Sequence, residues 1–247
     1  MRDLLDDYAA LAATGQPIGR AVVTSVWGSA PRPEGACMLA TPGGRLAGSV
    51  SGGCVESAVA TEIAEAIGRG TPKLVTFGVS DELAWEVGLS CGGTIKVFIE
   101  PAVRPELLAA ALGEGSMVVA TVIQSGSAAV SVGDSAVIRE GGESERSTMW
   151  LDDSLRKSAL TALAREASTS VEAVAADGAP FTVFLEVFPR RPTVVIFGAV
   201  QIAAALVTFA KALGYRTVVA DGRAAFLTHE RFPDADELIL AWPAEAF

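Results

Sequence analysis

The amino-acid sequence predicts an α/β fold, with a mixed α+β N-terminal domain over residues 1–188 and a smaller β-α-β domain over residues 193–247. Half of the 247 residues are hydrophobic and 19% are charged, which suffices for a buried core in a chain of two-domain length. Segments rich in β-branched residues alternate with segments of helical period. The stretch Pro189-Arg190-Arg191-Pro192 reads as a short stiff linker between the two domains.

The first domain opens with elements that follow from apolar spacing and turn residues. Two prolines and two glycines exclude a helix from GSAPRPEGA, residues 28–36. Val55, Val59 and Ile63 recur every four residues and predict a helix that ends at Gly68 or Gly70. The remaining expected elements here are a helix over 3–14, a strand over 20–27, a hairpin with strands over 37–41 and 45–50, and strands over 73–77 and 94–100.

In the second half of this domain, expected helices and strands alternate again along the sequence. We expect a helix over 102–112, three successive short strands (MVVATVIQ, SAAVSVG and SAVIREGG) within 117–142, a helix over 152–167 and a strand over 181–188.

After the linker, a strand, a glycine turn, a helix, a second strand and an acid follow one another within about 30 residues, an order typical of the opening of a Rossmann-like unit. The acid is Asp221 and the first turn glycine is Gly198, which makes both candidates for nucleotide binding. The position of the second fingerprint glycine is taken by Val200, however. We therefore expect a packing role here rather than NAD(P) binding.

The nine residues GSVSGGCVE, 48–56, place a thiol beside bare backbone. A strand is expected to end at Val50, and Gly52-Gly53 then turn the chain into a helix. Amides at a helix start lack intrahelical partners and carry the positive end of the dipole, so Ser51, Gly52 and Gly53 could hold an anion and favour the thiolate of Cys54. Alternatively, the glycines only form a tight turn and Cys54 packs as a small apolar residue.

A second cysteine-glycine corner, Cys91-Gly92-Gly93, precedes a strand, and the two corners could face one shared ligand. Arg32, in the 28–36 loop, could clamp a phosphate on that ligand, with ordinary surface charge as the alternative.

Composition excludes several functional classes. The net charge of −10 offers no basic patch for nucleic acid, and no apolar run approaches the roughly 18–20 residues that span a bilayer. The N-terminus is acidic and amphipathic, unlike a signal peptide, so we expect a cytoplasmic protein. The three cysteines suit neither a disulfide scaffold nor a zinc ribbon. The single histidine, His229, lies far from the cysteine corners, so no catalytic residue is assigned.

Three long phrases resemble the XdhC/CoxI family of xanthine dehydrogenase accessory proteins. They are GSAPRPEGACMLATPGGRLAGSVSGGCVES, FGVSDELAWEVGLSCGGTIKVFIEP and FGAVQIAAALVTFAKALGYRTVVADGRAAF. The resemblance implies a chaperone that transiently binds the molybdenum cofactor (molybdopterin), protects it, and delivers it to a xanthine dehydrogenase-type molybdenum hydroxylase. It also implies a homodimer, with a cysteine desulfurase as a further candidate partner.

By the same resemblance, Gly52, Gly53, Cys54, Cys91, Gly92 and Gly93 carry over most directly as cofactor-binding residues, and the two cysteines are candidate molybdenum contacts. Arg32 and Ser51, which the residues themselves suggest, complete the expected cofactor-binding set. The chain stops at Phe247, where the family normally continues, so we expect a truncated Rossmann-like domain or one completed by another chain. Two alternatives stay open: an NAD(P)-binding oxidoreductase that uses the C-terminal half, and a protein-interaction module with structural cysteines.

Overall fold

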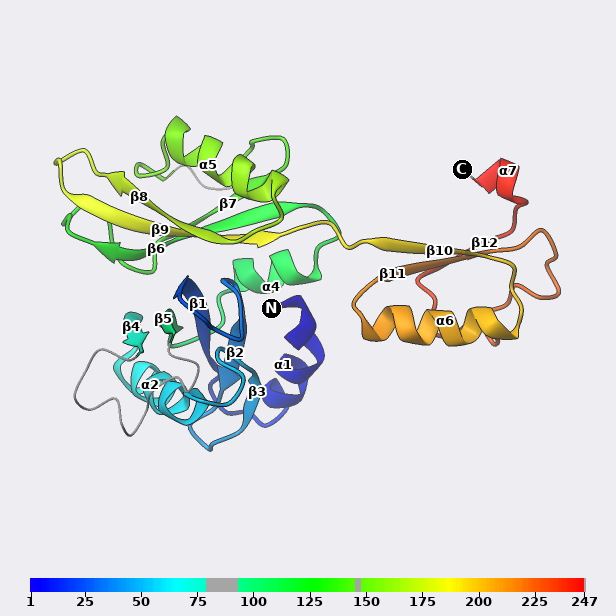
Figure 1. The fold of residues 1–247 in the computed structure, drawn as a ribbon, viewed down its shortest axis with the longest axis horizontal. Coiled ribbons are helices and arrows are strands. Elements are labelled where there is room, and N and C mark those ends of the chain that lie inside the picture. The colour runs from blue at the N-terminus through cyan, green and yellow to red at the C-terminus, as the bar shows by residue number, and fades with distance from the viewer. Residues whose placement is uncertain (79–92, 145–147, 247) are drawn as a thin grey trace. The chain divides into compact units, whose positions relative to one another are not determined.

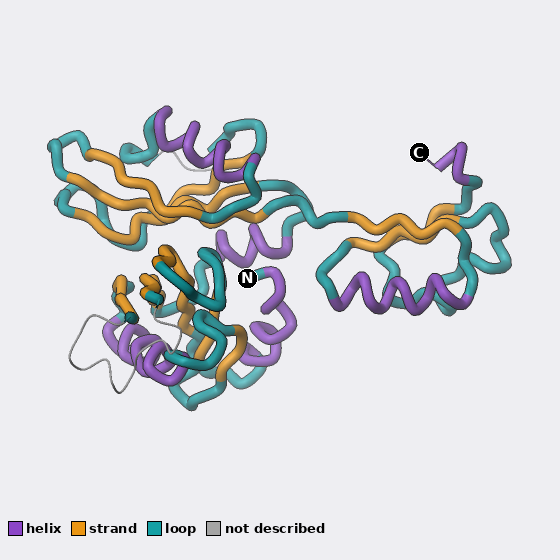
Figure 2. Tube along the Cα trace, viewed as in Figure 1, coloured by secondary structure: helices purple, strands orange, loops and turns teal. Residues whose placement is uncertain are grey.

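The computed structural model describes residues 1–78, 93–144 and 148–246. The chain divides into two compact units, Met1–Pro189 and Arg190–Phe247. Helices and three separate sheets make up the two units, which confirms the predicted α/β fold class (Figures 1 and 2).

A five-stranded antiparallel sheet forms the first layer of the N-terminal unit, in the order β3-β2-β1-β5-β4. Its strands are β1 (Gly19–Trp27), β2 (Cys37–Ala40), β3 (Leu46–Gly48), β4 (Lys73–Phe77) and β5 (Thr94–Glu100). Helix α2 (Glu56–Arg69) packs against one face through Val59 and Ile63. It ends at Gly70, whose φ of 69° is the left-handed conformation that glycine adopts without strain.

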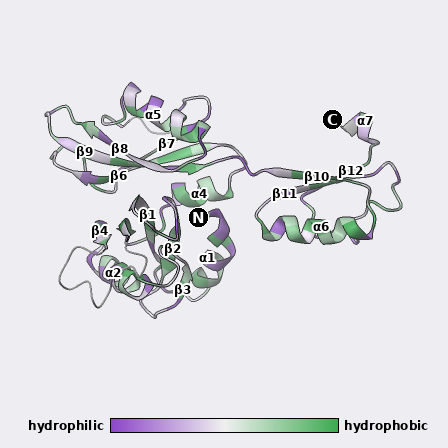
Figure 3. Cartoon of the chain, in the orientation of Figure 1, coloured by the Kyte–Doolittle hydropathy of each residue, from purple (hydrophilic) through white to green (hydrophobic). Residues whose placement is uncertain are grey.

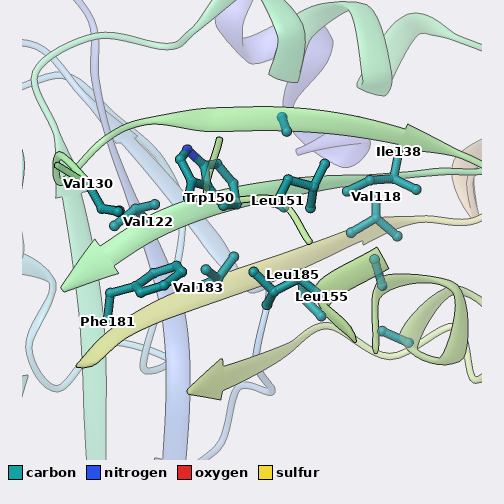
Figure 4. Packing of buried hydrophobic residues seen from close by; sticks show 14 of the residues in the cluster. Val118, Val122, Val130, Ile138, Trp150, Leu151, Leu155, Phe181, Val183 and Leu185 are labelled. Atoms are coloured by element: carbon teal, nitrogen blue, oxygen red, sulfur yellow. The ribbon is translucent and has the colours of Figure 1, made fainter. Parts of the chain in front are cut away.

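A four-stranded antiparallel sheet in the order β7-β6-β9-β8 forms the second layer. It contains β6 (Met117–Ser125), β7 (Ser135–Arg139), β8 (Thr169–Val174) and β9 (Pro180–Phe188). Helix α5 (Asp153–Ala164) begins at the N-cap Asp152, whose carboxylate accepts the Leu155 amide at 2.8 Å, and covers one face of this sheet (Figure 1). Beneath it, Trp150 and Phe181 meet edge to face with ring centroids 6.4 Å apart (Figure 4).

The remaining faces of the two sheets pack on each other. Val22 and Phe98 of the first sheet meet Ile123 and Phe184 of the second in one buried cluster. Beside it, a further cluster includes side chains of η1 (Arg2–Leu4), α1 (Leu5–Ala12) and α4 (Pro105–Leu112).

An ion network is buried where the sheets meet. The Arg20 guanidinium binds Glu100 at 2.6 Å and also pairs with Glu186, and these three side chains are at most 5% exposed. Arg104 extends the network, because it binds Glu100 at 2.7 Å and donates to the Thr121 hydroxyl at 2.7 Å.

The structure corrects two expected elements and adds one strand. SAAVSVG, residues 127–133, is a turn-rich connection and not a strand, because Ser127 binds Asp177 at 2.6 Å and Gly133 adopts a φ of 95°. Strand β8 was not expected. Helix α5 ends earlier than residue 167, since Glu166 leaves the helical region with a φ of 50°.

The C-terminal unit is a three-stranded parallel sheet in the order β10-β11-β12, formed by β10 (Thr193–Phe197), β11 (Arg216–Ala220) and β12 (Glu237–Ile239). Helix α6 (Gln201–Ala212) packs on it through Ala203 and Val207, and the short α7 spans Pro243–Ala246. On its other side α6 exposes apolar residues (Figure 3): Ile202, Leu206, Phe209 and, just past its end, Leu213. Among the described residues, no helix is long and apolar enough to cross a membrane.

Candidate functional site

The 28–36 loop is in contact with both glycine-containing segments that were expected to bind the cofactor, as far as the structure describes them. A side chain on Gly52 would lie 3.5 Å from Pro31, so the first cysteine-glycine corner packs against this loop. A Cβ on Gly93 would lie 2.8 Å from the Ser29 carbonyl carbon and closer still to its oxygen, so Gly93, the described residue of the second corner, touches the same loop. Arg32 belongs to the loop itself. Segments far apart in the sequence therefore converge on one place.

The amides of the first corner are already engaged by the chain's own carboxylate. Glu56, the first residue of α2, accepts the amides of Ser51 at 2.9 Å and Gly53 at 2.8 Å. The hydroxyls of Ser49 and Ser51 also donate to it, at 2.5 and 2.6 Å. The Cys54 amide donates to the Ser51 hydroxyl at 3.0 Å. These amide and hydroxyl donors of the corner are therefore bonded to acceptors within the corner.

This arrangement corrects the expected anion site. Partial burial raises the pKa of Glu56, but the hydrogen bonds from Ser49 and Ser51 outweigh it and lower that pKa to about 2. Glu56 is therefore ionised at neutral pH, and its charge fills the position at the helix N-terminus that a ligand anion would need. The corner positions Cys54 instead of providing open amides.

Cys54 is exposed, whereas Cys37 is buried. The alternative in which Cys54 packs as an apolar core residue is therefore wrong. Gly53 next to it has a φ of 121°, and among the described residues other than its chain neighbours no atom lies within 4 Å of the position that a Cβ would take.

A cavity of about 690 Å³ lies beside the 28–36 loop, lined by residues of this loop and by Val26, Ser168 and Val187. Arg32 lines it, and its Nε is buried with no hydrogen-bond partner in the described chain. Glu34 lines it too, and burial raises the pKa of that carboxyl although the Val26 amide opposes the shift. The cavity has the size and mixed polarity of a small-molecule site.

Cys91 and Gly92 lie outside the described residues. Within the described ranges, no cluster of three or more histidine, cysteine or carboxylate side chains is placed to hold a metal ion.

In the C-terminal unit, Asp221 is already bonded on both carboxylate oxygens. It accepts the Ala199 amide at 2.9 Å and two donors of the Arg223 side chain at 3.0 and 2.8 Å. The Arg223 guanidinium holds the pKa of Asp221 below its usual range and stacks on Phe226 at 4.4 Å. Gly198 has a φ of 101° and turns the chain into α6. These contacts favour the packing role that the sequence predicts.

Glu56 follows the glycine turn in the first helical turn, where an acid is a signal for capping the unpaired amides, and the structure confirms that role. Sequence reasoning missed Glu34, a second polar residue of this region. Glu34 carries no such signal, because only the fold brings it next to Ser168 and the end of α5.

Comparison with known proteins matches two segments to one family. Residues 11–78 match the model of the XdhC and CoxI family, and residues 194–246 match the model of the XdhC Rossmann domain. A Bacillus subtilis protein described as a probable xanthine dehydrogenase subunit is 27% identical over 91% of this chain and 66% of its own length. The Escherichia coli molybdenum cofactor insertion chaperone PaoD is 40% identical over 31% of this chain and 24% of its own length.

A solved structure agrees with these matches. The crystal structure described as a xanthine dehydrogenase from Bacillus halodurans is 28% identical and has a TM-score of 0.69, covering 99% of this chain and 70% of that one. The chain thus spans about two thirds of the length of the Bacillus subtilis relative and about a quarter of the Escherichia coli chaperone. Together with the cysteine-glycine corner, these matches confirm the resemblance to the XdhC and CoxI family that the sequence predicts.

Proposed function

We propose that this chain is a chaperone that binds the molybdenum cofactor, protects it, and delivers it to a xanthine dehydrogenase-type molybdenum hydroxylase. The observation that carries the proposal is the convergence of Arg32, the Cys54 corner and Gly93 on one loop in a chain that resembles this family. The names of the Bacillus subtilis and Escherichia coli relatives support the same class of cargo and recipient.

The residues present fit such a cargo. Molybdopterin is a phosphate-bearing pterin with two sulfur atoms, and Arg32 offers a buried donor that has no partner among the described residues. Cys54 offers an exposed, polarisable sulfur beside the backbone of Gly53. In the proposal, Ser51 and Gly52 complete the Cys54 corner, and Cys91, Gly92 and Gly93 also bind the cofactor. The cysteines contact molybdenum while the cofactor is held.

The proposal extends to domains and partners. Residues 1–188 bind the cofactor, residues 193–247 form the Rossmann-like domain, and the protein acts as a cytoplasmic homodimer that meets a cysteine desulfurase before the hydroxylase. The exposed apolar side of α6 supports a protein-binding role for the second domain. A monomeric mass at micromolar concentration would contradict the homodimer.

The direct test is to purify the protein from a molybdenum-replete host, release any bound pterin, oxidise it and measure its fluorescence. Wild-type protein should carry molybdopterin in a fixed ratio, and Cys54→Ala should carry several-fold less. Arg45→Ala, which removes an exposed charge outside the cavity lining, is the matched control and should retain it fully. Wild-type protein that carries no pterin would overturn the proposal.

A further inference from the structure

Four charged residues line the cavity beside the 28–36 loop: Asp3, Arg32, Glu34 and Glu166. Asp3 pairs with the N-terminal ammonium group, and two of the others, Arg32 and Glu34, carry opposite charges that do not pair with each other. Arg32 and Glu34 both line it, yet neither forms an ion pair within the described part of the chain. Leaving a half-buried cation and a half-buried anion unpaired costs solvation energy, which a ligand that bonds to both would recover.

We infer that this cavity binds a 2-amino-4-oxopyrimidine ring, the edge that pterins and guanine share, with Glu34 accepting its N–H groups and Arg32 donating to its oxygen. Where the ring belongs to molybdopterin, the inference rests on the proposed function. It then names the part of the cofactor that this chain recognises, which is the pyrimidine edge of the pterin.

Glu34 suits the donor edge of such a ring. A carboxylate presents two acceptor oxygens, which match the parallel N–H groups of the 2-amino group and the adjacent ring nitrogen. The pKa of Glu34 is raised by burial, with the Val26 amide opposing the shift, so the carboxyl sits in a partly desolvated place where hydrogen bonds to it are strong.

Arg32 suits the acceptor edge. Its planar guanidinium carries five donors, and the buried Nε has no partner in the described chain. Apolar side chains, among them Val26, Ala36 and Val187, line the same cavity and can contact the ring. The volume of about 690 Å³ falls within the roughly 300–1,000 Å³ of typical small-molecule sites.

A second cavity of about 480 Å³ shares Glu34 and Ser168 with the first. It adds two cations of α5 and its C-terminus, Lys157 and Arg165. Both molybdopterin and guanine nucleotides carry phosphate on a tail attached to the ring, so these cations provide a place for that group beyond Glu34.

The test uses three probes on the full chain: free pterin, lumazine and GMP. Lumazine has the same two rings as pterin with an oxygen in place of the 2-amino group, so it presents an acceptor to Glu34. We expect pterin to bind at least ten times more tightly than lumazine, measured by quenching of probe fluorescence. Glu34→Gln should weaken pterin binding about tenfold and remove the preference. Glu172→Gln, the same change at an exposed position outside both cavities, should alter neither.

Each outcome decides the inference. Equal affinity for pterin and lumazine, no binding of pterin or GMP at millimolar concentration, or an unchanged Glu34→Gln variant overturns it. Binding of GMP alone supports recognition of the shared edge and overturns its assignment to molybdopterin. Molybdopterin that co-purifies without pterin discrimination defeats this inference and leaves the proposed function standing. A preference for pterin over lumazine without co-purified molybdopterin supports this inference and overturns the proposed function.

Discussion

Arg20 of β1 and Glu186 of β9 form an ion pair that joins the two sheets of the N-terminal unit, with Arg20 1% and Glu186 4% exposed. Arg20 also binds Glu100 and approaches the Cys37 sulfur at 3.2 Å, so one guanidinium compensates two buried carboxylates. The pair fixes one sheet relative to the other, and the 28–36 loop extends from the same strand, β1.

Replacing Arg20 with Met should lower the free energy of unfolding by about 3–5 kcal/mol, because Glu100 and Glu186 would stay buried with their main counter-ion removed. Urea denaturation followed by tryptophan fluorescence measures the change. The matched control is Arg69→Met, which breaks an exposed pair with Glu65 and should cost at most about 1 kcal/mol. Equal effects of the two substitutions would contradict a structural role for the buried pair.

Replacing Glu56 with Gln should destabilise the protein by about 1 kcal/mol, because an NH₂ group would face donors that now share a carboxylate. Glu114→Gln, at an exposed position, is the control.

The carboxylate of Glu56 also makes the stability of the protein depend on pH. Its pKa is about 2 in the folded chain against an ordinary 4.5, so its contribution is complete above pH 4.5 and is lost as pH falls from 4.5 toward 2. Glu56→Gln should show a smaller loss over that window, and an identical pH profile would remove Glu56 from this role.

Much of the fold could be predicted because its signals are local. The period of Val55, Val59 and Ile63 predicted α2, and β-branched runs predicted β4 and β5 with the bounds that the structure has. Strand β8 (TSVEAV) escaped because Val171 is its only β-branched apolar residue before Val174, and its pairing with β9 is set by tertiary contacts. SAAVSVG has strand-like residues, but side-chain hydrogen bonds such as Ser127 to Asp177 hold it in turns.

The candidate site was predictable in part. The glycines locate the turn before α2 from sequence alone, and the place of Glu56 in the first helical turn indicates a capping role. That the hydroxyls of Ser49 and Ser51 also donate to Glu56 could not be concluded, because no local pattern reports it. The cavity depends on Ser168 and Val187, which are more than 130 residues away from Arg32. No local pattern reports such a contact.

Replacing Arg223 with Ala should raise the pKa of Asp221 toward its ordinary value, because the guanidinium that now bonds to that carboxylate lowers it. The carboxyl carbon signal of Asp221, followed by NMR through a pH titration, measures the shift.

The indole of Trp242 lies over Gly222, so its fluorescence reports on the same turn as Asp221. If wild-type Trp242 were quenched saturably by a nicotinamide dinucleotide, the packing role of Asp221 would be wrong.

Replacing Gly93 with Ala should disturb both stability and the proposed pterin cavity, because the new Cβ would lie 2.8 Å from the Ser29 carbonyl carbon and would overlap its oxygen. Backbone atoms cannot rotate away as a flexible side chain can, so the 28–36 loop must shift as a whole and carry Arg32 with it. We expect a loss of about 1–3 kcal/mol in unfolding free energy and a several-fold loss of pterin affinity. Gly115→Ala should change neither quantity, because no described atom beyond its chain neighbours lies within 4 Å of the new methyl group. If Gly93→Ala lost stability but kept full pterin affinity, the loop contact would be structural only, and the second corner would have no part in holding the ligand.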